Sequence, residues 1–494
     1  MNGMDEMGMT GQHITVPLCD RTVSSEVSGE YTLPDYQPEI RRLLWVKQTV
    51  LPPAKYIGGG QVELNGTVDY QILYVGGDGA VYSAPLSSEY SISVPLEPMA
   101  EADLGAGVTA FATTVCESVS TRVSAPRKIN IRSRLRSHVH AFGSILMEER
   151  ISGAADSSTV RRLGGEAENV YVTSGVSDMI TASTEFGGIG EDTRVITADA
   201  SVLMNEVSAQ DGMVSGCGEL LLKLMLCDEN GREECVTKKL SVEGQIEMDG
   251  MTGDGMCNMR GIVSEMSVTV EDGRILCEMG VILEARGLRN RVVHYTSDLY
   301  STAVESDCEY RSYSVPVALR CENGNVSQSE RIPLEGLNLP QGAFVLDAIG
   351  SVVWDGCELM GEKYVLSGQS RYQLLCRREE EYSVAELTLP VRLEVQGSGM
   401  TPTGYDAVGE VLSCRARIDG DTLNLDAELS VVADFMGTEE IRAVSEIRFG
   451  EQLDCQGNRM VVYYPTSEDT AWTVAKRYHI SPEKLSEGSF YYVI

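Results

Sequence analysis

Cysteine and histidine are the residue types in this chain that could bind a metal or act as nucleophiles. The chain has 13 cysteines and 5 histidines, and no two cysteines are closer than Cys227 and Cys235. A zinc site usually brings paired ligands roughly two to four residues apart. Cys277 lies in an alternating apolar row, as a buried thiol would. We therefore expect no metal and no cofactor, with buried or free thiols in a reducing cytoplasm. Disulfides, or a metal held by distant parts of the chain, are the alternative.

The motifs of common enzyme classes are absent from the sequence. It contains no Walker lysine loop, no HExxH, no GxSxG and no GxGxxG. The 49 glycines fall instead in Asp-Gly and Gly-Gly turn settings, flanked by alternating apolar residues. A Ser/His/Asp or Cys/His arrangement assembled from distant segments is the remaining route to catalysis. We expect no catalytic residues and a protein that is not an enzyme.

A row of cations marks one expected strand, residues 128–141. Alternate side chains of a strand share a face, and the apolar face here consists of Ile129, Ile131, Leu135 and Val139. The two histidines of the opposite face could add pH sensitivity, but a metal site built on them needs further ligands that the sequence does not identify. The opposite face carries the candidate partner-binding residues Lys128, Arg132, Arg134, Arg136, His138 and His140.

On the equivalent face further along the chain, the strand of the third repeat is acidic and that of the second is mixed. One reading is that each row is solvated, or paired with residues of neighbouring strands. The other is that the basic row docks an acidic surface on a partner, or on the third repeat of a neighbouring copy, giving head-to-tail self-association. Aligned on the glycines at 143, 287 and 437, the second strand has Glu278, Ile282 and Glu284, and the third has Asp426, Glu428 and Asp434.

The elements that must position these residues are short strands in three repeated units. Period-two alternation of Val, Ile, Leu and Tyr dominates up to about residue 450. The segment 64–73 recurs as 366–375 and, more weakly, as 218–225, which places glycines at 66, 368 and 218. A second landmark recurs at 119–120, 263–264 and 412–413. We expect a mainly β protein with a flexible tail, 1–15, and three antiparallel sandwich or barrel-like repeats, 16–143, 162–301 and 308–450.

The last 35 residues have a different pattern. Residues 460–464 read as a strand, after which Asp469 can cap a helix over 470–478. Ser481 and Pro482 can open a second short helix, since proline is favoured at the first helical position. Residues 489–494 read as a closing strand. We expect a small βααβ domain over 460–494.

This terminal segment resembles a LysM domain, whose usual motif is Gly-Asp-Thr-Leu-Trp-x-Ile-Ala. Glu468 stands in place of the expected glycine and Ala471 in place of the leucine, and the segment after Leu485 is shorter than in the family. These departures suggest an incomplete glycan groove. The candidate partner-binding residues that the resemblance implies are Asp469, Thr470, Trp472, Lys476, Arg477 and Tyr478.

The preceding units, with the segments 16–19 and 32–40 ahead of the first landmark, resemble the repeated SipL-type module of clostridial and related spore-forming bacteria. The resemblance implies a spore-envelope morphogenetic protein of the mother-cell cytoplasm and forespore surface. Such proteins tether the basement-layer ATPase of the spore coat to the forespore, and their LysM end contributes to that contact. The expected function is therefore a non-enzymatic scaffold that binds partner proteins. The alternative is a cell-wall protein that binds peptidoglycan or another N-acetylglucosamine polymer through the LysM-like domain.

The charge of the chain excludes some partners. With 73 acidic and 40 basic residues its net charge is −33, and nucleic-acid binding needs clustered cations. The longest apolar run, 220–227, is interrupted by Lys223 and is far shorter than the roughly 20 residues of a membrane span. The first residues do not resemble a secretory signal. Residues 16–143 hold 11 basic and 13 acidic side chains, a net of −2, whereas 165–450 hold 22 and 49, a net of −27. We expect a cytoplasmic, polarised acidic protein that neither binds nucleic acid nor inserts into membranes.

Overall fold

The chain folds almost entirely into antiparallel β-sheets, which confirms the expected mainly β class. The computed structural model describes residues 12–97, 107–188, 190, 192–337, 339–340, 342–453, 462–464, 466, 469–488 and 491–493. Most of the tail expected over 1–15 lies outside these residues. Residues 12–15 do not belong to a tail, because they begin the first strand and pair with residues 144–147.

The first pair of sheets is built by residues 12–147. One sheet has the order β1-β7-β6, and in the other β2 and β3 both pair with one edge of β4 while β5 pairs with its other edge. The expected apolar face of β7 is confirmed, since Ile129, Leu135 and Val139 have no exposed surface. The strands are β1 (Gln12–Thr32), β2 (Ile40–Val50), β3 (Ala54–Gly58), β4 (Gln61–Gly76), β5 (Val81–Pro95), β6 (Thr109–Ala125) and β7 (Lys128–Met147).

The second pair of sheets has the same order of strands. In one sheet β9 and β10 together pair with β15, which pairs with β14, and the other has the order β11-β12-β13. The strands are β9 (Val160–Val176), β10 (Ile180–Gly187), β11 (Arg194–Gln210), β12 (Met213–Cys227), β13 (Glu233–Glu247), β14 (Met256–Glu271) and β15 (Arg274–Ser301).

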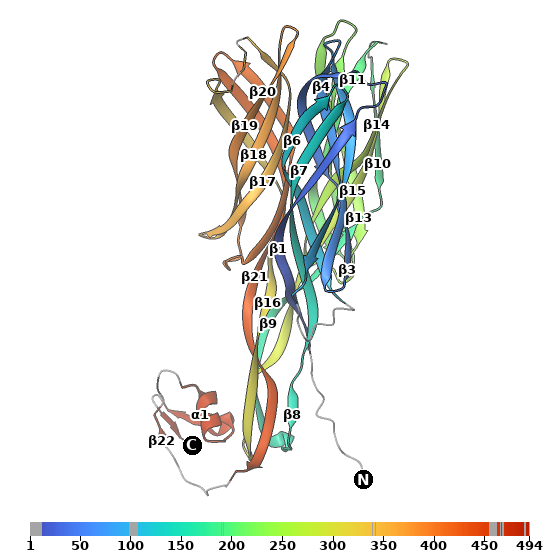
Figure 1. Cartoon of the computed structure of the whole chain (residues 1–494). Helices are drawn as coiled ribbons and strands as arrows, with labels where there is room; N and C mark the ends of the chain where they lie inside the picture. Colours follow the sequence, from blue (N-terminus) through green and yellow to red (C-terminus); the bar gives the residue numbers. More distant parts are fainter. Residues whose placement is uncertain are drawn as a thin grey trace.

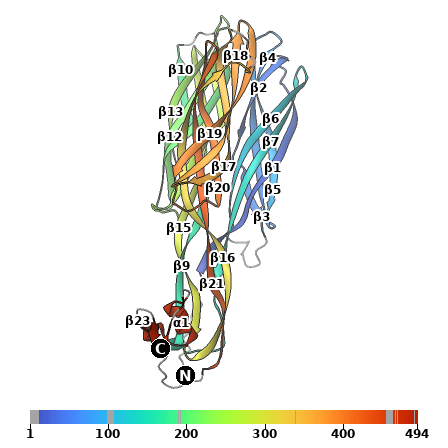
Figure 2. The ribbon, with the colours of Figure 1, turned by 90° about the vertical axis from the view of Figure 1, so that its left-hand side faces the viewer.

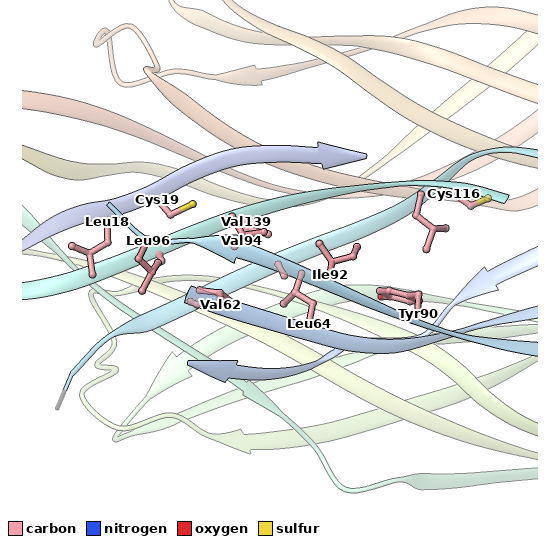
Figure 3. Close-up of a cluster of buried hydrophobic side chains, with 14 of the residues drawn as sticks. Leu18, Cys19, Val62, Leu64, Tyr90, Ile92, Val94, Leu96, Cys116 and Val139 are labelled. Atoms are coloured by element: carbon pink, nitrogen blue, oxygen red, sulfur yellow. The ribbon is translucent and has the colours of Figure 1, made fainter. Parts of the chain in front are cut away.

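The third pair follows the same scheme, with the orders β16-β21-β20 and β17-β18-β19. Each pair encloses an apolar cluster, and the cluster of the first pair also takes in residues of the other two pairs. Figure 3 shows the first of these, in which Leu64 of β4, Val94 of β5 and Val139 of β7 lie between the strands. The strands of the third pair are β16 (Val304–Pro333), β17 (Phe344–Met360), β18 (Lys363–Arg378), β19 (Glu381–Gln396), β20 (Gly404–Asp419) and β21 (Thr422–Gln452).

The three sheet pairs meet through equivalent β-bulges. Leu44 of β2, Ile196 of β11 and Leu346 of β17 are each the extra residue of a bulge against the neighbouring central strand. A bulge turns a side chain away from the regular alternation, and these three side chains join one apolar cluster that contains residues of all three pairs. The three sheet pairs therefore share a hydrophobic contact.

The repeated glycines lie on the central strands β4, β12 and β18, next to a break in pairing. A Cβ atom at Gly218 would lie 2.0 Å from the carbonyl oxygen of Leu203, and one at Gly368 would lie 2.3 Å from that of Val353. Both neighbours directly precede a second bulge of the adjacent strand. Gly218 and Gly368 are thus required because the bulged backbone approaches closely, whereas a Cβ at Gly66 would meet the side chain of Tyr90.

A narrow stalk extends from one end of the sheets (Figures 1 and 2). We define the stalk as residues 160–166 of β9, 294–301 of β15, 304–313 of β16 and 441–452 of β21, together with β8 (Arg150–Ser152). Leu299, Val444 and Ile447 pack inside it. β8 pairs in parallel with β21, and a 3₁₀ turn, η1 (Ser157–Thr159), precedes β9. The segment between the first two sheet pairs is therefore partly structured.

The terminal elements lie beside the stalk (Figure 1). They are β22 (Val462–Tyr463), α1 (Ala471–Arg477), the 3₁₀ turn η2 (Pro482–Lys484), β23 (Ser486–Gly488) and β24 (Tyr491–Val493), with the sheet order β22-β24-β23. We call them the terminal module. The prediction that Asp469 caps the helix is wrong. Thr470, whose backbone is extended, caps α1, and its hydroxyl accepts a hydrogen bond from the backbone N–H of Thr473. Ser481 precedes η2 as expected, but its side chain makes no capping hydrogen bond. The expected strand ends, residues 460 and 494, lie outside the described residues.

In the described residues, no helix has the length and hydropathy needed to cross a membrane. The cysteines of this part of the chain are free thiols, and Cys277 is 1% exposed, as its place in the alternating row predicts.

Candidate functional site

The terminal module is attached to the stalk through one carboxylate. The indole Nε1 of Trp472 donates to Oδ2 of Asp298 at 2.8 Å, and the ammonium of Lys476 lies 2.5 Å from Oδ1 of the same group. The Trp472 ring meets Tyr300 edge-on, with ring centroids 5.0 Å apart. Burial opposes the charge of Asp298, but hydrogen bonds from Lys476, Tyr310 and Trp472 lower its pKa below the ordinary value. This geometry makes a charge-assisted anchor on β15.

Three more contacts surround this anchor. The hydroxyl of Tyr300 donates to the carbonyl of Ile480 at 2.6 Å, and Nε of Arg161 donates to Oγ of Ser481 at 3.2 Å. The ring of His479 lies 3.1 Å from the carbonyl of Ser301. The tips of β9 and β15 thus contact the segment that follows α1.

The other predicted residues of the terminal module serve its own structure. The carboxylate of Asp469 accepts from the backbone of Thr466 at 2.9 Å and from the hydroxyl of Tyr463 at 2.8 Å. Arg477 lies 3.6 Å from Asp469, and the ring of Tyr478 packs edge-on against Tyr463. These contacts hold β22 against α1.

Among the six residues predicted from the LysM resemblance, Trp472 and Lys476 contact the stalk, whereas Asp469, Thr470, Arg477 and Tyr478 hold the module together. Asp298 and Tyr300 are the residues that sequence reasoning missed. Asp298 lies 174 residues before Trp472, and no local pattern marks it.

The basic row of β7 is paired with acids on its two neighbouring strands. Lys128 lies 2.8 Å from Glu30 and Arg132 lies 3.1 Å from Glu26, both on β1. On the other side, Glu117 of β6 faces Arg134 at 3.3 Å and Arg136 at 3.5 Å. The four cations therefore fit the reading of local pairing. Docking of this row on an acidic surface outside the chain stays a prediction.

The histidine end of the row forms a cluster with two aspartates. Asp20 of β1 is opposite His140 in the pairing, and its Oδ1 lies 2.8 Å from Nε2 of His138 and 3.6 Å from Nδ1 of His140. The other ring nitrogen of His138 lies 3.7 Å from Oδ1 of Asp406, on β20. Burial opposes the charge of His138, but hydrogen bonds with Asp20 and Asp406 raise its pKa to about 9. Burial and the neighbouring His138 lower the pKa of His140 to about 4.

Behind this cluster lies a buried arginine between two carboxylates. Arg286 of β15 is paired with Asp406, and its guanidinium also lies 3.1 Å from Asp434 of β21. Thr113 of β6 contacts both Arg286 and Asp406. Burial opposes the charge of Asp406, but Arg286 and His138 hold its pKa well below the ordinary value. All three sheet pairs contribute to this junction.

The strand positions whose charge changes sign between the repeats lie in part at this junction. The aligned positions His140, Glu284 and Asp434 are all buried, and Glu284 is paired with Arg260 at 2.7 Å. These positions are not solvated, because the sheet pairs pack against each other there. His140 and Glu284 lie opposite Asp20 and Arg260 on neighbouring strands, which fits the reading of local pairing. With its lowered pKa His140 is neutral near pH 7, and the cation that offsets Asp406 and Asp434 at this junction is Arg286.

A second polar cluster joins the sheet pairs closer to the shared apolar cluster. Lys47 of β2 is paired with Asp199 of β11, and Lys223 of β12 lies 2.8 Å from Asp347 of β17. Burial raises the pKa of the neighbouring Glu410 to about 7. The carboxyl group of Glu410 therefore changes its charge as the pH passes through about 7.

Comparison with known proteins adds no family to this picture, since no family model matches the chain and no curated protein matches it.

Proposed function

We propose that this protein is a non-enzymatic scaffold or adaptor that binds partner proteins during assembly of the spore coat. The observation that carries the proposal is the place of the terminal module. It sits beside a narrow stalk and away from the three sheet pairs (Figure 1), where a second protein can approach it. The last turn of its helix α1 contains the basic residues Lys476 and Arg477. The ion pair between Lys476 and Asp298 anchors the module to the stalk.

The three sheet pairs are three copies of one β-module in this proposal. Three features support it: the common strand order, the equivalent bulges at Leu44, Ile196 and Leu346, and the glycines on the central strands. The terminal module is a shortened LysM-like domain, which the order of β22, α1, η2 and β24 supports. The first assignment follows the SipL-type resemblance of the sequence, and the second follows its LysM resemblance.

The partner in this proposal is the basement-layer ATPase of the spore coat, met in the mother-cell cytoplasm at the forespore surface. The stalk already occupies Trp472 and Lys476, so the partner meets the opposite side of α1. Ala471, Thr473 and Arg477 are exposed there.

Binding to that ATPase tests the proposal. Purified full-length chain is expected to bind the basement-layer ATPase of its own organism, and Ala471→Arg should weaken binding by about tenfold or more, because a large cation then occupies a contact surface. Lys484→Glu, an exposed change on η2, is the matched control and should bind as the wild type. Absence of binding by the wild-type chain would overturn the proposal.

A sedimentation assay with purified peptidoglycan separates the proposal from the glycan-binding alternative. A protein-only adaptor is expected to stay in the supernatant. Retention of the full-length chain in the pellet, lost in the Ala471→Arg variant, would favour the cell-wall function instead.

A further inference from the structure

Asp20, His138 and His140 form a compact set of metal-ligating atoms. One ligand atom from each residue lies within 4.8 Å of the other two. Two of these separations are 2.8 and 3.6 Å, both measured from Oδ1 of Asp20. An ion with bonds of about 2.0–2.1 Å in tetrahedral geometry holds its ligand atoms roughly 3.3 Å apart. The observed distances lie on either side of this value.

The backbone holds these residues in place. β1 and β7 pair from end to end except for a bulge between Pro17 and Cys19, and Asp20 is directly opposite His140. His138 is two residues earlier on β7, so the side chains of all three extend from the same face of the sheet. All three residues of the site thus lie within strands and not in a loop.

The surroundings supply what a ligating histidine needs. A metal-bound imidazole usually directs its other ring nitrogen to a carboxylate, which fixes its orientation. The Nδ1 of His138 lies 3.7 Å from Asp406, and Asp406 is itself held by Arg286 and Thr113. This carboxylate comes from the third sheet pair, whereas the ligands come from the first.

Burial across the cluster is graded. His140 is 1% exposed, and the ring nitrogen that faces Asp20 is Nδ1, while its Nε2 is buried without a hydrogen-bond partner among the described residues. The Asp20 side chain is 51% exposed at the other end. An ion can therefore enter from the side of Asp20, and a water molecule can complete its coordination.

From this geometry we propose that Asp20, His138 and His140 bind a divalent transition-metal ion of the zinc type. Two imidazole nitrogens and one carboxylate, with an open fourth position, are the donors that such ions favour. The ion stiffens the junction between the first and third sheet pairs, because Asp406 holds one of its ligands. This site is independent of the proposed partner binding.

Metal titration of the full-length chain tests the site. With thiols reduced and metals first removed, we expect one Co²⁺ per chain, with an absorption spectrum free of thiolate-to-cobalt charge transfer. Zn²⁺ should displace it and raise the unfolding temperature. Asp20→Asn, a change at a half-exposed residue that should leave the fold intact, should weaken binding by about tenfold or more. His138→Gln should weaken it further.

His294→Gln is the matched control, because His294 is an exposed histidine that faces Glu166 at 3.3 Å outside the cluster. It should bind the ion as the wild type does. Wild-type affinity in Asp20→Asn, a cobalt spectrum dominated by thiolate ligands, or no bound ion at micromolar metal would each overturn the site.

Discussion

Trp472 of α1 donates a hydrogen bond of 2.8 Å to Asp298 of β15, across 174 residues of sequence. The same carboxylate accepts from Lys476 and from Tyr310, so it is shared between the terminal module and the stalk. One acid thus fixes where the module sits.

Asp298→Ala should release the terminal module from the stalk. Hydrogen bonds to charged groups contribute about 1.5–3 kcal/mol, and this change removes those from Trp472 and Lys476 together. We expect the amides of α1 to exchange with deuterium markedly faster, while those of β12 keep their protection. Asp307→Asn, at an exposed position of the same stalk, is the control. Equal exchange of α1 in Asp298→Ala and the wild type would refute the anchor.

Acid should also release the module. The pKa of Asp298 is below its ordinary value of 3.8 in the folded chain, so its stabilising effect is present above that value and is lost as the pH falls through the folded pKa. The indole N–H resonance of Trp472 should keep its position from pH 7 to pH 5 and shift only at stronger acidity. A shift between pH 7 and pH 5 would point to another group.

Glu410 should make the protein less stable as the pH rises. Its pKa of about 7 in the folded chain lies above the ordinary 4.5, so the folded chain keeps a proton that the unfolded chain has released. Stability therefore falls as the pH rises through this window. At pH 8, Glu410→Gln should increase the free energy of unfolding by about 1–3 kcal/mol and so raise the unfolding temperature. At pH 4.5 it should change both little. Exposed Glu278→Gln is the control.

Gly218→Ala should destabilise the second sheet pair. The added methyl group would lie 2.0 Å from the carbonyl oxygen of Leu203, so the bulged backbone must move, at a cost of about 1–3 kcal/mol. Gly356→Ala is the matched change, because a Cβ there meets no atom of the described residues within 4 Å. Equal unfolding temperatures for the two variants would contradict the role of the close approach.

Arg286→Met should be more damaging than any loss of a surface cation. It removes the cation that lies between buried Asp406 and Asp434 and leaves His138, 3.7 Å from Asp406, as the neighbouring positive group, which costs about 3–5 kcal/mol. Arg274→Met is the control, since Arg274 is 61% exposed and pairs with exposed Glu185. Thermal unfolding at neutral pH distinguishes the two.

Local patterns in the sequence predicted the strands well. The alternation of Ile129, Leu135 and Val139 assigns the buried face of β7 because side chains of a strand alternate strictly. The recurrent glycines mark the central strands, and at Gly218 and Gly368 only glycine fits beside the bulged backbone.

Contacts between distant strands could not be predicted in the same way. The histidine pair was visible, but Asp20 lies 118 residues before His138 and reaches it only through the pairing of β1 with β7. Asp298 is likewise one acid among 73. The packing of equivalent strands against each other also buried Asp434, whose alternation alone suggests a solvated position.

The expression time and position of a fluorescent fusion to the full-length chain test the central claim most directly. An adaptor of spore-coat assembly is expected to appear only in sporulating cells and to form a shell around the forespore, on its mother-cell side. Uniform cytoplasmic signal in growing cells would contradict the account.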